Sequence, residues 1–157
     1  MASLTSAVLP SIQQYDKLLP FQFTPRNYQK PVLKALATGT KRAVAVWHRR
    51  AGKEKTFFNY VAWAAFQRVG TYYYIFPTYA QAKKVLWTGM DGSGFHFMGN
   101  FPKEIVTKSR EDELRKDLVN GSAIQLVGSD NIDAIMGTNP LGVVFSEYAL
   151  QNPQAWD

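Results

Sequence analysis

A short apolar run, a basic glycine-containing loop and a long apolar-rich segment follow one another near the middle of the first half of this chain. Residues 43–46 read Ala-Val-Ala-Val, and residues 47–56 read Trp-His-Arg-Arg-Ala-Gly-Lys-Glu-Lys-Thr. A continuous apolar run is typical of a strand covered on both faces, so residues 43–47 predict a strand that leads through a tight loop into a helix. A Gly-Lys pair at the mouth of a helix favours an anion, because backbone N–H groups and the helix dipole point at it.

The loop matches the phosphate-binding pattern G-x-x-x-x-G-K-[ST] only in part. Counted back from Lys53, Trp47 replaces the first glycine, and Glu54 replaces the hydroxyl residue after the lysine. From these residues alone, a nucleotide site and a plain basic turn both remain open. A register that uses Lys55 and Thr56 would put Glu54 where glycine lets the backbone approach phosphate, so Lys53 is the preferred lysine.

The composition indicates one globular domain. Of the 157 residues, 46% are apolar and 14% aromatic, which is enough for a core. The absence of cysteine excludes disulfides and cysteine-bearing zinc sites, and with two separated histidines a metal would depend on carboxylates. The net charge of +6 suits a polyanionic partner, although a basic surface also serves solubility. No apolar run approaches the roughly 20 residues of a membrane span, and no signal peptide is visible, which predicts a soluble protein that is not exported.

The first half of the chain predicts alternating helices and strands. Residues 1–23 are poorly periodic and are interpreted as an arm that leads into a domain at residues 24–157. Thr24 is expected to cap a helix that has Pro25 at its first position and ends at Gly39.

Beyond the basic loop the same alternation continues. Residues 57–70 carry an apolar stripe at helical spacing, residues 71–76 are β-branched and aromatic, and Thr78 is placed to cap a helix at residues 79–87. Together with the loop, these segments predict a parallel α/β sheet.

In the second half, residues 89–101 are rich in glycine and predict a surface loop. Asn120-Gly121, flanked by apolar residues, predicts a β-hairpin, while a helix at residues 110–119 remains an alternative. Residues 141–147 predict a buried strand.

This last strand ends on a carboxylate, Glu147. Ligands of parallel α/β sheets bind at the carboxyl ends of the strands, which would place Glu147 beside the loop. In nucleotide hydrolases of this architecture, one acid at that edge holds Mg²⁺ and a neighbouring glutamate polarises the attacking water. Glu147 fills the second place and Ser146, a hydroxyl, the first; a purely structural acid at a strand end is the alternative. Gln29 could read an adenine edge, because its amide both donates and accepts, or could be a solvated helix residue.

Four motifs therefore follow one another: residues 49–53, residues 76–82, residues 120–122, and residues 137–140 with 143–149. In this order they resemble the N-terminal ATPase domain of the large terminase subunit of tailed bacteriophages, from residue 24 to the end of the chain. The resemblance implies a RecA-like P-loop fold of the additional-strand catalytic-Glu class. Such a fold has a mostly parallel central sheet flanked by helices, here with a β-hairpin insertion.

The resemblance also implies a function. It implies an ATP- and Mg²⁺-dependent motor that drives double-stranded DNA into a procapsid, in the cytoplasm of the infected bacterial host. Expected partners are the portal protein and the small terminase subunit, and the assembled motor is expected to be a homo-oligomeric ring.

Site residues are carried over from the same motifs. Gly52 and Lys53 match the Walker A loop, Glu147 the catalytic glutamate and Gln29 the adenine-reading glutamine. The other candidate ATP contacts are Arg49, Arg50, Ala51, Glu54, Lys55 and Thr56. The candidate metal ligands are Glu147, Ser146 and Thr56, the last as a substitute hydroxyl.

The chain departs from the family pattern at three places. Members of the family have a hydroxyl after the Walker A lysine and an Asp before the glutamate, where this chain has Glu54 and Ser146. Many have an arginine where this chain has Met136, so Arg49 or Arg50 is the expected arginine finger. An acid beside a triphosphate repels it, which predicts that Glu54 turns away from the phosphates or lies in the outer shell of the metal.

The chain is expected to be a fragment, because a terminase continues into a coupling motif and a nuclease domain beyond this length. Two other functions remain open. One is a helicase-like ATPase, and the other is a non-catalytic, basic DNA-binding or assembly module with a decayed phosphate loop.

Overall fold

The computed structural model describes residues 23–155, so the predicted arm lies outside the described residues except for Phe23. The strands are β1 (Thr71–Phe76), β2 (Val106–Arg110), β3 (Arg115–Leu118), β4 (Ala123–Gly128) and β5 (Gly142–Phe145). The α-helices are α2 (Lys30–Ala37), α3 (Lys53–Gln67) and α4 (Tyr79–Ala82), and a π-helix, η2 (Lys83–Trp87), continues α4. Short 3-10 helices are η3 (Phe97–Asn100), η4 (Lys103–Ile105), η5 (Ser129–Ile135), η6 (Tyr148–Leu150) and η7 (Pro153–Ala155).

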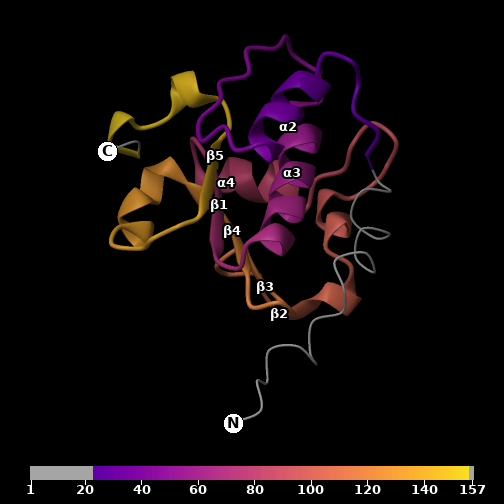
Figure 1. Ribbon diagram of the computed structural model, residues 1–157. Helices are drawn as coiled ribbons and strands as arrows, with labels where there is room; N and C mark the ends of the chain where they lie inside the picture. The colour runs from indigo at the N-terminus through magenta and orange to yellow at the C-terminus, as the bar shows by residue number, and fades with distance from the viewer. Residues whose placement is uncertain (1–22, 156–157) are drawn as a thin grey trace.

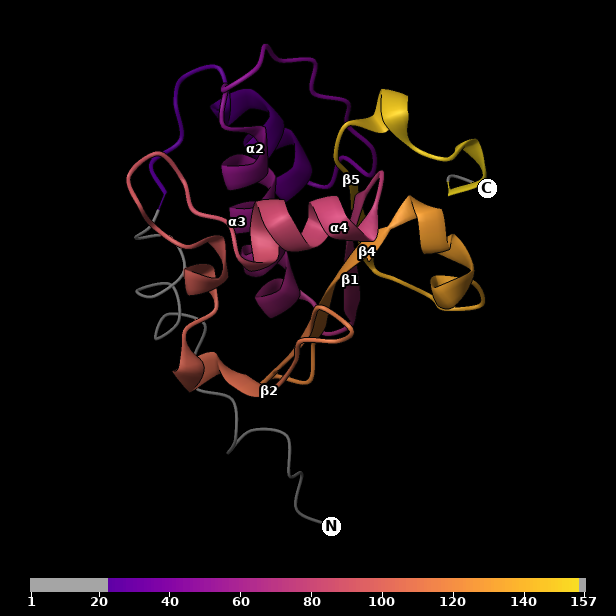
Figure 2. The same cartoon turned by 180° about the vertical axis from the view of Figure 1, so that it is seen from behind.

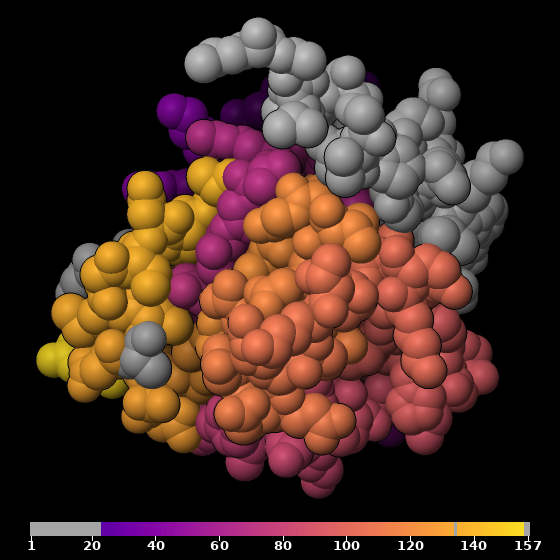
Figure 3. Space-filling model, turned by 90° about the horizontal axis from the view of Figure 1, so that it is seen from below, coloured from indigo at the N-terminus to yellow at the C-terminus, as the bar shows by residue number. Residues whose placement is uncertain are grey.

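The strands form one mixed sheet in the order β2-β3-β4-β1-β5 (Figure 1). Strand β1 pairs in parallel with both β4 and β5, and β3 pairs antiparallel with β2 and β4. The predicted α/β class and the hairpin at Asn120-Gly121 are confirmed, and the alternative helix at residues 110–119 is wrong. The sheet is less parallel than predicted, because the antiparallel pair β2–β3 extends it on the β4 side. This extension forms much of the surface seen from below (Figure 3).

Strand β1 lies at the centre of the core because its side chains are apolar or aromatic on both faces. Tyr72, Tyr74 and Phe76 belong to the larger core cluster, which also takes in residues of α3, α4 and η2. Tyr73 and Ile75 point to the other face, where partly buried residues of η5 pack. Figures 1 and 2 agree that α2, α3 and α4 lie on one side of the strands and η5 on the other. The expectation of flanking helices therefore holds for α-helices on one face only.

Two predicted elements differ in the structure. Residues 43–47 form no strand, and Val44 and Val46 are each 90% exposed. The run does not pair with β5, although β5 is an edge strand, and its two valine side chains lie in solvent. The helix predicted from Thr24 begins at Lys30 instead, with Gln29 as its N-cap and a proline in its first turn.

The strand predicted at residues 141–147 is present as β5 but is shorter and only partly buried, and the end of the predicted surface loop at residues 89–101 is buried in η3. Other predicted elements are confirmed. Helix α3 covers the predicted stripe, and Thr78 caps α4 by accepting a hydrogen bond of 3.2 Å from the backbone N–H of Gln81. Gly39 follows α2 with a φ of 104°, a left-handed value that stops the helix. Within residues 23–155, no helix has the length and apolar content to cross a bilayer.

Candidate functional site

The basic loop turns into α3 through a left-handed glycine. Gly52 is the N-cap of α3, with φ 77° and ψ 31°, a conformation in which a side chain would be strained. A Cβ atom built on Gly52 would lie 3.2 Å from Nε2 of Gln29, so the position is also tight. The first N–H groups of a helix have no partner within the helix. The local geometry is therefore that of an anion-binding helix start, with Lys53 as its first residue.

The end of β5 meets this helix start. The Nζ atom of Lys53 donates a hydrogen bond of 3.1 Å to Oε1 of Glu147, across 94 residues of sequence. Both side chains are accessible, with exposed fractions of 27% and 53%. Glu147 itself has a φ of 50°, a left-handed value that is costly for a residue other than glycine and is typical of functional sites. The structure thus brings together the two residues that the sequence placed at the centre of the site.

Glu54 points at the sheet. Its two carboxylate oxygens accept hydrogen bonds of 2.6 Å from the hydroxyls of Tyr74 in β1 and Ser146 at the end of β5. Loss of solvent raises the pKa of Glu54, the two hydroxyls oppose this rise, and the nearby charge of Glu147 adds to it. The tyrosine could not have been assigned to the site from the sequence, because only the parallel pairing of β1 with β5 brings it there.

Gln29 connects the start of α2 to the loop. Its Oε1 accepts from the backbone N–H of Arg26, and its Nε2 donates to the carbonyl of Ala51, both at 2.8 Å. The side chain is 2% exposed, and Ala51 is buried as well. The hydroxyl of Tyr28 donates to the same carbonyl at 2.9 Å. The amide that the sequence assigned to adenine is therefore held by backbone groups in this structure.

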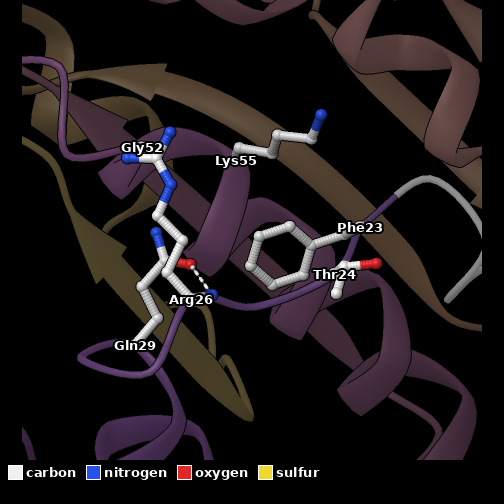
Figure 4. Close-up of a pocket in the computed structure, with 6 residues that line it drawn as sticks. All are labelled: Phe23, Thr24, Arg26, Gln29, Gly52 and Lys55. Carbon is white, nitrogen blue, oxygen red and sulfur yellow. Dashed lines mark hydrogen bonds between the residues drawn. The ribbon is translucent and has the colours of Figure 1, made fainter.

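A small cavity lies beside this glutamine, with a volume of about 160 Å³. Its lining is shown in Figure 4: Phe23, Thr24, Arg26, Gln29, Gly52 and Lys55. The cavity thus adjoins the first turn of α3, and its largely polar wall includes the aromatic ring of Phe23. A flat heterocycle suits such a lining, because a ring can stack on an aromatic face.

The other predicted site residues divide into three groups. Arg49 and Arg50 are exposed on the loop. Lys55 forms an ion pair with Asp91, which the sequence did not single out. Thr56 is fully buried and its hydroxyl donates to the carbonyl of Gly52 at 2.9 Å, so the structure does not bring it to the site surface.

Trp47 occupies the place of the first glycine of the phosphate-binding pattern. Its ring stacks on Phe57 of α3 with a centroid distance of 5.7 Å, and the edge of Tyr28 meets it at 5.6 Å. These contacts fasten the start of the loop to α3 and to the segment before α2. A large aromatic side chain is compatible with the loop because it packs against the helix.

The arrangement suits Mg²⁺ held jointly with a phosphate ligand. Among residues 23–155, no three His, Asp or Glu side chains gather into a metal-binding group. Mg²⁺ accepts one or two carboxylates and completes its shell with phosphate oxygens and water. The oxygen donors at the end of β5 and the start of α3 are Glu147, Ser146 and Glu54, and all are hard ligands that fit this ion.

Comparisons with known proteins show the fold. No protein-family model matches the chain, and no curated protein matches it. Among solved structures, the chain is similar to the large terminase ATPase domain of Thermus phage P74-26, with a TM-score of 0.63 and 20% sequence identity. The match covers 94% of this chain and 61% of that chain. The fold is therefore that of a terminase ATPase domain, and this chain spans less than two thirds of the length of the solved one.

Proposed function

We propose that this domain binds ATP with Mg²⁺ and hydrolyses it, as the motor domain of a DNA-packaging terminase of the RecA-like P-loop class. The observation that carries the proposal is the contact between Lys53 and Glu147 at the start of α3. A lysine and a carboxylate from distant segments meet where backbone N–H groups favour an anion, which are the parts that phosphoryl transfer requires. The similarity in fold to a terminase ATPase domain supports the same function.

Each residue has a separate role in this proposal. The ammonium group of Lys53 and the N–H groups that follow Gly52 bind the β and γ phosphates. Glu147 accepts a hydrogen bond from water and aligns it for in-line attack on the γ-phosphorus, while Arg49 or Arg50 offsets the charge that develops on the phosphate. Glu147 and Ser146 would hold Mg²⁺ when it is bound with the nucleotide, and the ion would supply positive charge that offsets the charge of the phosphates. Most of the rate enhancement then comes from positioning and electrostatics.

The adenine ring is assigned to the cavity beside Gln29. The ring of Phe23 forms one wall and Lys55 another, and the cavity adjoins Gly52, where the phosphates are placed. In this proposal Gln29 keeps its bond to Ala51 and shapes the pocket. Ribose would then connect an adenine in the cavity to phosphates at Gly52, which lines the cavity.

Double-stranded DNA is the proposed substrate of the motor, with the portal protein and the small terminase subunit as partners in a ring. The net charge of +6 supports a polyanionic partner. The rate of ATP hydrolysis is expected to rise when duplex DNA is added. This increase should become smaller as the salt concentration rises, because salt weakens DNA binding.

The proposal is tested by ATP affinity and phosphate release, with and without duplex DNA. Lys53→Ala should weaken ATP binding about tenfold or more, because a charge-assisted contact to phosphate is lost. Glu147→Gln should retain ATP binding and lower phosphate release by about 10²–10⁴-fold, as loss of a general base does. The matched controls are Lys84→Ala and Glu104→Gln, which change exposed residues distant in sequence from Lys53 and Glu147. Unchanged affinity in the first variant together with unchanged release in the second would overturn the proposal.

A further inference from the structure

Two consecutive residues at the start of α3 contact two consecutive residues at the end of β5. Lys53 pairs with Glu147 at 3.1 Å, and Glu54 accepts from the hydroxyl of Ser146 at 2.6 Å. The backbone of Ser146 is fixed on both sides, because its N–H donates to Ile75 at 2.8 Å and its carbonyl accepts from Gln151 at 2.6 Å. In the first contact an ammonium group meets a carboxylate, and in the second a hydroxyl donates to a carboxylate.

The charged side chains of these two contacts are one lysine and two glutamates. Lys53 supplies one positive charge, and Glu54 and Glu147 supply two negative charges. Among the ion pairs of the described residues none includes Glu54, whose oxygens meet only the hydroxyls of Tyr74 and Ser146. Hydroxyls orient a carboxylate but leave its charge in place, and a partly buried carboxylate is costly without a cation. A cation bound by Glu54 would offset this cost.

We propose that Glu54, in place of Ser146, is the ligand of the nucleotide's divalent cation beside Glu147, and that the hydroxyl of Ser146 orients it. The proposal rests on the proposed function, since the cation is the one that accompanies ATP. The family pattern places a hydroxyl after the lysine and a carboxylate before the glutamate. In this chain the same two groups stand in exchanged positions, and the hydrogen bond between Glu54 and Ser146 shows that they still form a pair. The two departures from the pattern compensate each other.

The chemistry of the pair favours a divalent cation of the Mg²⁺ type. A carboxylate oxygen on a helix start, a second carboxylate at Glu147 and phosphate oxygens form an all-oxygen set, which is what this ion prefers. The hydroxyls of Ser146 and Tyr74 occupy one lone pair on each oxygen of Glu54 and leave others for the metal. Such outer partners fix the orientation of a ligand and are worth about 10–100-fold in metal affinity.

A purely structural role makes a different prediction. If Glu54 only links α3 to the strands, Glu54→Gln keeps the size of the side chain and an oxygen that accepts from a hydroxyl. The stability of the fold would then change while the effect of Mg²⁺ on ATP affinity would not. A ligand role requires the negative charge, so the same variant should lose the effect of the metal.

The test is calorimetric titration of ATP into the full chain, with Mg²⁺ and with EDTA, accompanied by thermal unfolding of every variant. In the unmodified chain Mg²⁺ should strengthen ATP binding. Glu54→Gln should reduce this enhancement about tenfold or more, while Glu104→Gln, an exposed acid on η4, should leave it unchanged. Glu54→Thr leaves two hydroxyls and no carboxylate, so it should lose the enhancement. The double variant Glu54→Thr/Ser146→Asp restores one of each and should regain it.

The outcomes separate the two proposals. No ATP binding by the unmodified chain under either condition would remove the proposed function and this inference together. ATP binding that is equally strong with Mg²⁺ and with EDTA, or a folded Glu54→Gln variant with the full enhancement, would overturn the metal role of Glu54 and leave ATP binding standing. If Glu54→Gln fails to fold, the double variant decides. A folded double variant in which Mg²⁺ does not strengthen ATP binding overturns the proposed exchange of carboxylate and hydroxyl between positions 54 and 146. A double variant in which Mg²⁺ does strengthen ATP binding supports it.

Discussion

At the scale of the residue, Gly52 is the position where backbone conformation and contact act together. Its φ of 77° is left-handed, and a Cβ atom would press on Nε2 of Gln29. Gly137 has nearly the same φ, 78°, but a Cβ atom there would meet nothing within 4 Å. The two glycines therefore separate the cost of the backbone conformation from the cost of the contact.

Gly52→Ala should lower the free energy of unfolding by more than Gly137→Ala does. The backbone term, shared by both, is roughly 1–2 kcal/mol. The contact with Gln29 adds to it in Gly52→Ala and should also weaken ATP binding, because the amide clamp on Ala51 has to shift. Urea unfolding of both variants measures the difference, and equal losses would show that Gln29 moves aside without cost.

At the scale of the element, the loop between η2 and η3 is fastened to α3 by a single acid. Asp91 forms an ion pair with Lys55, and its Oδ1 accepts from the hydroxyl and N–H of Ser93 and from the N–H of Phe95. The Lys55 ammonium lowers the pKa of Asp91 below its ordinary value of 3.8, and the bonds from Ser93 lower it further. The glycine-rich segment is thereby held beside the first turn of α3.

The lowered pKa sets the direction of a pH dependence. Because the folded chain holds Asp91 ionised more strongly than the unfolded chain does, this contribution to stability is present above the ordinary value of 3.8 and is lost as pH falls through the folded pKa. Asp91→Asn lacks the contribution, so the difference in unfolding free energy between the two chains should be largest near neutral pH and shrink below pH 3.8. Urea unfolding at a series of pH values measures it. Asp112→Asn, at an exposed turn residue, should cost little at neutral pH, and a difference for Asp91→Asn that does not shrink in acid would contradict the assignment.

Elements with their own local signals were predictable from the sequence. The aromatic run of β1 and the Asn120-Gly121 turn carry their information in neighbouring residues, and both were found as predicted. Residues 43–47 were mispredicted because an apolar pattern specifies burial only if a partner strand is present. Strand β2 was missed, since its burial alternates weakly and it depends on pairing with β3.

The site was predictable to the same extent. The sequence identified Lys53 and Glu147 through the motifs around them, and the structure places them in contact. It could not identify Tyr74 or Asp91, because each reaches the site through an element that no local pattern connects to it. The bond between Glu54 and Ser146 was hidden for the same reason, although both residues had been noticed separately as departures.

At the scale of the whole molecule, nucleotide binding should increase the free energy of unfolding and the Tm. A ligand that binds only the folded state stabilises it by about 2.7 kcal/mol at a concentration about 100-fold above Kd. For a chain of this length that corresponds to a rise in Tm of roughly 5–10 °C. Thermal unfolding with ATP and Mg²⁺ measures the rise, which Lys53→Ala should largely remove. No rise at millimolar nucleotide would favour a non-catalytic DNA-binding module over an ATPase.

The ion pair between Lys53 and Glu147 has a consequence for the proposed function, because it couples phosphate binding to the carboxylate. The carboxylate of Glu147 would compete with phosphate for the ammonium group of Lys53, which it contacts at 3.1 Å. By reciprocity, the ion pair with Glu147 weakens phosphate binding by the same factor by which bound phosphate weakens the ion pair. In the proposed cycle, a phosphate that binds Lys53 would free Oε1 of Glu147 to accept a hydrogen bond from water.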